Sequence, residues 1–455
     1  MAEGAGPLAR ALRRLRARAE PTTLTALSPQ LDGPSALQLR SVIDDVVSGR
    51  GGEVAARRRA EHVAEMFLGL DRLGKERFFR LLDDHYGVNP GEIDVAAQAV
   101  VEAPNDERTQ LEHRLRSALE PAREKLFRRF LGVDSGLAFL VRLRADLHQV
   151  SQGGQFAELD RELHRLLEQW FDIGLLQLEH ITWQSPASLL EKLIDYEAVH
   201  EIASWEDLQN RLGPDRRCFA FQHPSLPDDL LIFVEVALTE GLADNIVDLI
   251  DPAVPDPDPG RANTAIFYSI SNCQDGLAGV RLGDFLIKRV VAELQAELPN
   301  IRGFATLSPI PGFRPWLEEL IAADALMLEE LSGFSAGDPR SLAEMLNDAL
   351  VDDAWYSRPD LVASLQPYLP RLCARYLCDA RRGTRALDPV ANFHLSNGAR
   401  VERLQFLANP ARVGQNRALG MMVNYRYLPE QIEENHDSYF RDGFVHRSTE
   451  IDALL

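Results

Sequence analysis

The stretch FATLSPIPGF, residues 304–313, places a serine where a β-strand is forced to stop. The residues before Ser308 favour a strand, and Pro309 and Pro311 follow within three positions. Proline has no amide donor for a sheet and restricts the residue before it, so the strand should end here. Two interpretations follow. Ser308 either forms a local turn or presents a rigidly held hydroxyl for chemistry.

A glycine-rich link precedes this serine along the chain. In SISNCQDGLAGVRLGDFLIKRVV (269–291), a strand runs into a loop containing Gly276, Gly279 and Gly283, and a helix begins at the third glycine. Glycines let amide groups approach a phosphate, and a helix N-terminus adds positive potential. Neither the dinucleotide fingerprint nor the P-loop pattern is present. The link is therefore either structural or a phosphate cradle, at the sheet edge where ligands collect.

His394 stands in PVANFHLSNG, a run with the composition of a strand and a turn at Asn397–Gly398. We expect a strand over 390–406. A histidine in such a run is either a core residue or an acid–base group, with an ordinary pKa of about 6.5. Five other histidines lie in charged helical surroundings and are expected at the surface: His62, His85, His113, His148 and His164. No paired cysteine or histidine spacing of a metal site occurs, so no metal is expected.

A second serine motif matches a catalytic pattern but lacks the flanking elements that the pattern requires. GFSAG, residues 333–337, matches the nucleophile elbow of hydrolases. That elbow needs a strand before the serine and a helix after it. The preceding run has helical spacing, so Ser335 is expected in a helix–helix link and a hydrolase is disfavoured.

The elements that must position these residues fall into two groups. Helical spacing dominates 38–50, 54–70, 75–87 and 159–181, whereas strand-like runs appear at 217–224, 230–238, 264–272 and 301–309. An amphipathic helix at 283–299 lies between two of these runs, which implies a parallel crossover. We expect an α+β protein of two domains. These are a helical bundle over 1–182 and an α/β domain with a mixed sheet over 183–455.

Composition narrows the range of partners and compartments. The 455 residues carry a formal charge of −20, which argues against nucleic acid or an anionic membrane as the main partner. Four cysteines are too few for a disulfide framework, so a cytoplasmic protein is expected. The Arg-rich start, residues 1–20, allows a mitochondrial presequence as the alternative. No stretch is long and apolar enough to span a bilayer.

At these segments the sequence resembles the malonyl-CoA decarboxylase family. The matching stretches run in family order from about residue 77 to residue 430: FFRLLDDHYGV, LLQLEHITWQSPASLLEKLIDYEAVHEI, FYSISNCQDGLAGVRLGDFLIKRVV, LSPIPGF, DPVANFHLSNGA and VNYRYLPE. The resemblance implies a helical domain that serves assembly into a homodimer or homotetramer. It also implies a catalytic domain similar to the GNAT-like acetyltransferase fold, which binds coenzyme A.

The resemblance also implies roles for individual residues. Ser308 and His394 would be the catalytic pair, and Tyr427 a neighbouring site residue. Malonyl-CoA would contact Ala278, Gly279, Val280, Arg281, Leu282, Gly283 and Asp284. Arg281 departs from the pattern, because animal members carry a glutamate there, so no role of that acidic side chain is carried over.

The implied reaction is the conversion of malonyl-CoA to acetyl-CoA and CO2 by a carboxy-lyase of fatty acid metabolism. The thioester serves as the electron sink, so no cofactor is expected. Two alternatives stay open: an acyltransferase on the same scaffold, and a non-catalytic helical scaffold that binds acyl-CoA. Decarboxylation needs both Ser308 and His394, whereas a binding module would keep its affinity without them.

Overall fold

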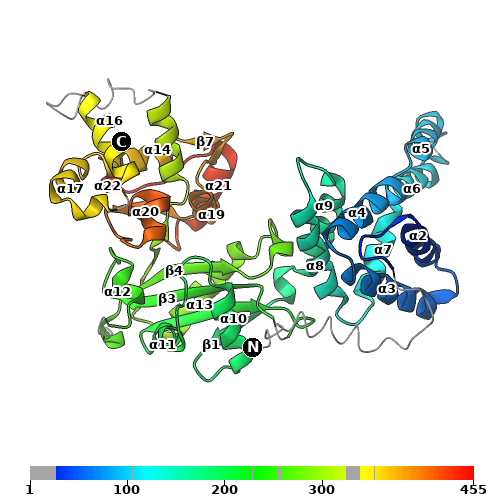
Figure 1. Ribbon diagram of the computed structural model, residues 1–455, viewed down its shortest axis with the longest axis horizontal. Coiled ribbons are helices and arrows are strands. Elements are labelled where there is room, and N and C mark those ends of the chain that lie inside the picture. The colour runs from blue at the N-terminus through cyan, green and yellow to red at the C-terminus, as the bar shows by residue number, and fades with distance from the viewer. Residues whose placement is uncertain (1–26, 105, 228, 254–257, 324–338, 353) are drawn as a thin grey trace. The chain divides into compact units, whose positions relative to one another are not determined.

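The computed structural model describes residues 27–104, 106–227, 229–253, 258–323, 339–352 and 354–455. They form two compact units (Figure 1). The first extends to Gln177 and also includes 221–231 and 272–282, and the second holds 178–220, 232–271 and 283–455. Ser335 and its GFSAG motif lie outside the described residues. No described helix is both long and apolar enough to cross a membrane.

The first unit is a helical bundle built around phenylalanine side chains. Its helices are α2 (Gly33–Ser48), α3 (Gly52–Leu68), α4 (Arg72–Tyr86), α5 (Pro90–Glu102), α6 (Arg108–Ala118), α7 (Ala122–Leu131), α8 (Gly136–Val150) and α9 (Ala157–Trp170). Phe67 packs edge-on against Phe79 and Phe139, with ring centroids 5.6 and 5.8 Å apart. The helices expected at 38–50, 54–70 and 75–87 are confirmed.

The helix expected over 159–181 is wrong in its second half. Helix α9 ends at Trp170, and β1 (Gln177–Ile181) follows a 3-10 turn at Ile173–Leu175. The Asp172 side chain accepts a hydrogen bond from the amide of Gly174 at 2.9 Å, which begins the 3-10 turn. Side-chain bonding of this kind competes with the helical pattern and starts a new element.

The second unit is organised by a mixed sheet of eight strands among the described residues. Their order is β1-β2-β3-β4-β5-β10-β6, with β9 also paired to β10. The remaining bounds are β2 (Arg216–Gln222), β3 (Ile232–Thr239), β4 (Thr264–Asn272), β5 (Gly303–Thr306), β6 (Ser308–Pro309), β9 (Arg400–Gln405) and β10 (Met422–Tyr427).

Strands β4 and β5 are parallel, with Ala265 opposite Phe304. The crossover between them carries α13 (Gly283–Glu297), as the sequence predicts. Strand β10 runs antiparallel to β5, β6 and β9, which makes the sheet mixed. The predicted fold class, a helical bundle followed by a domain with a mixed sheet, is confirmed.

Helices and one small hairpin complete the second unit. The helices are α10 (Ala187–Tyr196), α11 (Trp205–Arg211), α12 (Val247–Ile250), α14 (Phe313–Ala322), α16 (Pro339–Val351), α17 (Pro359–Leu365), α18 (Leu369–Cys378), α19 (Pro389–Ser396), α20 (Arg412–Ala418), α21 (Ile432–Asp442) and α22 (Thr449–Asp452). The hairpin pairs β7 (Arg381–Arg382) with β8 (Arg385–Ala386).

A buried ion pair fixes α11 to the sheet. Arg211 on α11 donates to Glu235 of β3 at 3.2 Å and to Asp207 at 2.8 Å. Burial and the neighbouring Glu197 raise the pKa of Glu235, whereas the Arg211 guanidinium lowers it and favours the carboxylate. A buried acid with one charged partner is costly to leave unpaired, so this contact constrains the position of α11.

Candidate active site

Ser308 lies on a strand rather than just beyond one. Strand β5 ends at Thr306, and β6 resumes at Ser308–Pro309, where Ser308 pairs with Val423 and Pro309 with Met422. The predicted break is therefore displaced to Leu307. Strand β6 lies at the end of the sheet order, where proline needs no ladder donor on its outer side. The two prolines thus shorten this edge strand instead of ending it before Ser308.

His394 lies on helix α19, so the expected strand over 390–406 is wrong in its first half. Asp388 caps this helix, because its carboxylate accepts from the amides of Val390 and Ala391, each at 2.9 Å. Pro389 stands in the first turn, a position that tolerates its missing N–H. The strand begins only at Arg400. Capping of the first turn overrides the strand-like composition of the run.

Three predicted residues meet in one chain of hydrogen bonds. The distance from Ser308 Oγ to His394 Nε2 is 3.2 Å, and that from His394 Nδ1 to the Tyr427 hydroxyl is 2.8 Å. Ser308 also donates to Thr306 Oγ1 at 2.8 Å. When Ser308 donates to Thr306, His394 must donate through Nε2–H and accept from Tyr427 at Nδ1. In this arrangement each hydrogen bond of the series is donated toward Ser308: Tyr427 donates to His394, and His394 donates to Ser308. Moving a proton along the series would reverse the direction of these hydrogen bonds.

The imidazole of His394 is buried among other side chains. Its ring is buried and stacked on Tyr425, with centroids 4.6 Å apart. Burial lowers the pKa of His394 to about 3. This overturns the expectation of an ordinary histidine pKa, because desolvation penalises the imidazolium. His394 is neutral at neutral pH and can act as both donor and acceptor.

Asp388 links the elements that carry the pair. Its second oxygen accepts from the amide of Gly312, in the loop after Ser308, at 3.2 Å and from the Tyr376 hydroxyl at 3.3 Å. A Cβ on Gly312 would lie 2.1 Å from the Tyr376 oxygen, so glycine is required there. One buried carboxylate thus holds both the start of α19 and the loop that follows β6.

Asn424 fixes the other side of the pair. Its amide donates to the carbonyl of Thr306 at 2.8 Å, and its oxygen accepts from Gln405 at 2.8 Å. The amide of Tyr425 donates to Thr306 Oγ1 at 3.1 Å. Thr306, the acceptor for Ser308, is therefore locked in place by β10.

The predicted acyl-CoA loop divides between the two units. Ala278, Gly279, Val280, Arg281 and Leu282 belong to the first unit, whereas Gly283 and Asp284 begin α13 of the second. A Cβ on Gly283 would lie 2.5 Å from the ring of Phe393, the neighbour of His394. The helix start thus packs against the helix that carries His394. Arg281 is exposed, and the side chain of Asp284 is outside what the structure describes.

Sequence reasoning missed three residues that shape this site: Thr306, Tyr376 and Asp388. One of them had a readable signal, since Asp388–Pro389 is the usual start of a capped helix. Thr306 and Tyr376 carry no such signal, because their roles depend on contacts formed only in the folded sheet and its helices.

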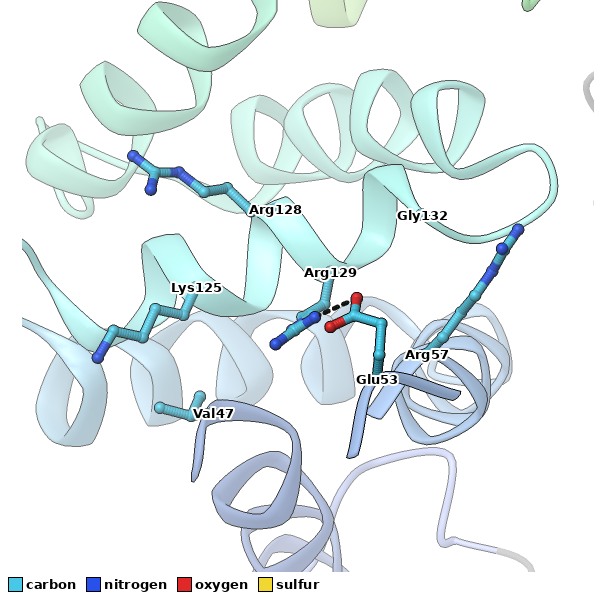
Figure 2. Close-up of a pocket in the computed structure, with 7 residues that line it drawn as sticks. All are labelled: Val47, Glu53, Arg57, Lys125, Arg128, Arg129 and Gly132. Carbon is cyan, nitrogen blue, oxygen red and sulfur yellow. Dashed lines mark hydrogen bonds and ion pairs between the residues drawn. The ribbon is translucent and has the colours of Figure 1, made fainter. Parts of the chain in front are cut away.

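A separate cavity of about 390 Å³ lies in the helical unit (Figure 2). It is lined by Val47, Glu53, Arg57, Lys125, Arg128, Arg129 and Gly132. Three of the four cationic side chains pair with carboxylates: Arg57 with Asp134, Arg128 with Glu124, and Arg129 with Glu53. Its charge is largely compensated, and it contains none of the predicted site residues.

Comparison with known families gives matches over most of the chain. The model of the malonyl-CoA decarboxylase C-terminal domain matches residues 174–455, and that of the N-terminal domain matches residues 86–171. The mitochondrial malonyl-CoA decarboxylase of Rattus norvegicus is 36% identical over 461 residues, covering 97% of this chain and 90% of the relative. That of Anser anser anser is 37% identical over 418 residues, covering 87% and 83%.

Solved structures give the same result. The crystal structure of malonyl-CoA decarboxylase from Agrobacterium vitis has a TM-score of 0.84 and 38% identity, and covers 92% of this chain and 99% of that chain. The enzyme from Rhodopseudomonas palustris has a TM-score of 0.84 and 37% identity, with the same coverage.

The burial of His394 predicts a pH effect on stability. The unfolded chain binds a proton at this histidine below about pH 6.5, whereas the folded protein binds it only near pH 3. Stability should therefore fall as pH drops through this window. Replacement by glutamine should remove the effect. The wild type should therefore lose stability relative to His394→Gln as pH falls below 7, with a slope that approaches about 1.4 kcal/mol per pH unit below pH 6.

Urea unfolding of both proteins at pH 7, 6 and 5 measures this difference. All other titrating groups cancel in the comparison, because they are common to both proteins. A stability difference that stays constant across these pH values would show that His394 keeps an ordinary pKa in the fold.

Proposed function

The chain belongs to the malonyl-CoA decarboxylase family, and from that premise we propose that it converts malonyl-CoA to acetyl-CoA and CO2 with Ser308 and His394 as the reacting pair. The observation that carries the assignment of the pair is the hydrogen-bond chain from Tyr427 through His394 to Ser308. These three side chains lie far apart in the sequence, and the fold brings a buried hydroxyl within hydrogen-bond distance of a buried neutral imidazole.

The reaction proceeds in two steps, decarboxylation and protonation. The bond between the α-carbon and the carboxylate breaks, CO2 leaves, and the electron pair moves into the thioester carbonyl to give an enolate. A proton must then reach the α-carbon. The enzyme must therefore orient the carboxylate, stabilise the enolate oxygen and deliver one proton. We propose that backbone groups at the end of β4 (Thr264–Asn272) serve the enolate oxygen.

A neutral His394 suits the protonation step as a proton relay rather than as a cationic acid. Ser308 gives its hydroxyl proton to carbon and regains one from His394 Nε2–H. His394 then takes the Tyr427 proton at Nδ1, and solvent restores Tyr427. No buried imidazolium is formed, but His394 is left as the Nδ1–H tautomer. Proton exchange with solvent in the reverse direction along the same chain must restore Nε2–H before the next turnover. In the alternative, Ser308 binds the malonyl carboxylate and His394 alone delivers the proton.

The direct test is incubation with malonyl-CoA alone. Acetyl-CoA and CO2 should form in equal amounts with no added metal or organic cofactor, and EDTA should not change the rate, because the thioester accepts the electrons itself. Activity lost in EDTA and restored by zinc would overturn the cofactor-free mechanism. Product that forms only with an added amine or carrier acceptor would instead indicate an acyltransferase.

The pair itself is tested by single and double substitution. Ser308→Ala and His394→Ala should each lower kcat by roughly 100-fold or more, the scale of positioned acid–base groups. Acetyl-CoA binding should change little. If both act on one proton path, the double variant should be scarcely slower than either single variant. Multiplicative losses would support the alternative with independent roles, and full activity in either single variant would exclude that residue.

We also propose a cytoplasmic homodimer or homotetramer. Helices α5 and α6 pack on each other yet contain no buried residue, and Figure 1 shows them extending from the other helices. Val95 and Val101 on α5 are 73% and 79% exposed. Light scattering should give the mass of a dimer or tetramer, and the substitution Val95→Glu should weaken this self-association. A monomer mass at micromolar concentration would contradict the homo-oligomer. Recovery of the protein from cells only in the mitochondrial fraction would contradict the cytoplasmic location.

A further inference from the structure

The predicted acyl-CoA loop is held by an arginine of the helical unit. Arg144 on α8 donates through one terminal nitrogen to the carbonyls of Gly276 and Ala278, at 2.9 and 2.7 Å. Its side chain is 4% exposed. Hydrogen bonds from a buried cation to neutral carbonyls are stronger than neutral ones, so these contacts fix the loop backbone.

The charge of Arg144 is balanced on its other side. Its Nε donates to Asp160 of α9 at 2.8 Å, and His148 contacts the same carboxylate oxygen at 2.8 Å. Burial would raise the pKa of Asp160, but the hydrogen bonds from Arg144 and His148 bring it below its usual value. Asp160 therefore stays ionised at neutral pH and holds the guanidinium in the orientation that reaches the loop.

The loop is also seated closely against both helices. A Cβ on Gly276 would lie 1.9 Å from the carbonyl oxygen of Val141 on α8, and one on Gly279 would lie 3.2 Å from His164 on α9. Gly279 adopts a φ of 84°, which side chains rarely tolerate. At Gly276 and Gly279 the loop thus presents its backbone to the two helices. The loop conformation is therefore set by α8 and α9.

The fixed carbonyls determine where the loop amides point. In a trans peptide, the carbonyl and the following N–H point in opposite directions. Because the Ala278 carbonyl faces Arg144, the Gly279 N–H is directed away from Arg144. An N–H held in this way is a ready donor for an anionic or carbonyl group of a ligand.

We propose that Arg144 is a positioning residue for acyl-CoA, so that the helical unit sets substrate affinity in addition to any role in assembly. The inference rests on the proposed function, in which residues 278–284 contact malonyl-CoA. Arg144 touches no substrate itself. It acts by holding residues 276–282 in the conformation that receives the ligand.

Arg144→Met in the full chain tests the proposal. The dissociation constant of acetyl-CoA, measured by calorimetry, and the KM for malonyl-CoA should both rise about 10-fold or more, the scale of lost charged hydrogen bonds. The kcat should stay within about threefold, because only binding common to the ground and transition states is removed. Amide hydrogen exchange in 276–282 should accelerate. Arg144→Lys, which keeps the positive charge but not the planar set of N–H donors of a guanidinium, should recover part of the affinity.

Arg123→Met is the matched control. Arg123 is also 4% exposed and lies in the same unit, but it pairs with Glu162 and Asp83 and does not contact the loop. Its loss should lower thermal stability without changing the acetyl-CoA affinity. If Arg144→Met does not fold, Arg144→Lys carries the test, with an intermediate rise in KM expected.

Two results would overturn the proposal. Either both Arg144 variants bind acetyl-CoA within twofold of the wild type, or Arg123→Met weakens binding as much as Arg144→Met. These results differ from a failure of the proposed function, in which the wild type itself would neither bind acetyl-CoA nor consume malonyl-CoA.

Discussion

The carboxylate of Asp388 is the contact on which the geometry of the second unit's site depends. It is fully buried, and four hydrogen-bond donors converge on its two oxygens. Two of these donors belong to the first turn of α19, and one belongs to the loop after β6. Burial raises the pKa of this acid while the amide bonds oppose the rise. The carboxylate therefore fixes the separation between Ser308 and His394 without contacting either of them.

A second theme is the low polarity around the reacting groups. Thr306, Tyr425 and His394 are nearly or fully buried, and the imidazole is neutral as a result. In such surroundings a charged intermediate on the protein would be expensive, whereas proton exchange among neutral hydroxyl and imidazole groups is not. Burial likewise raises the pKa of Glu235 on strand β3. This half of the molecule favours neutral side chains at its centre and places its charges in tight pairs.

Most of the helices and strands could be predicted from the sequence, whereas the start of α19, the pKa of His394 and the contacts of Arg144 could not. The parallel crossover through α13 and the early helices followed from periodicity and glycine positions, because these signals are local. The strand predicted over 390–406 is wrong for residues 390–396, because their apolar composition favours a strand while the cap formed by Asp388 and Pro389 starts a helix. The pKa of His394 could not be predicted, because it depends on burial by Tyr425 and other distant residues. Arg144 was out of reach for the same reason, as its acceptors lie 132 and 134 residues away.

The composition of the first unit bears on how the chain folds during synthesis. Residues 221–231 and 272–282 complete this unit, although its main segment ends at Gln177. Residues 178–220 and 232–271, which lie between these segments in the sequence, belong to the second unit. Its helices can form as they emerge, yet Arg144 has no loop carbonyls to hold until Gly276 and Ala278 have been made. The order of synthesis thus differs from the order of assembly. In an N-terminal fragment cut between the two family domains, Arg144 would keep its bond to Asp160 but lose both carbonyl acceptors of its terminal nitrogen. The surface that residues 272–282 cover in the full chain would also be left open to aggregation.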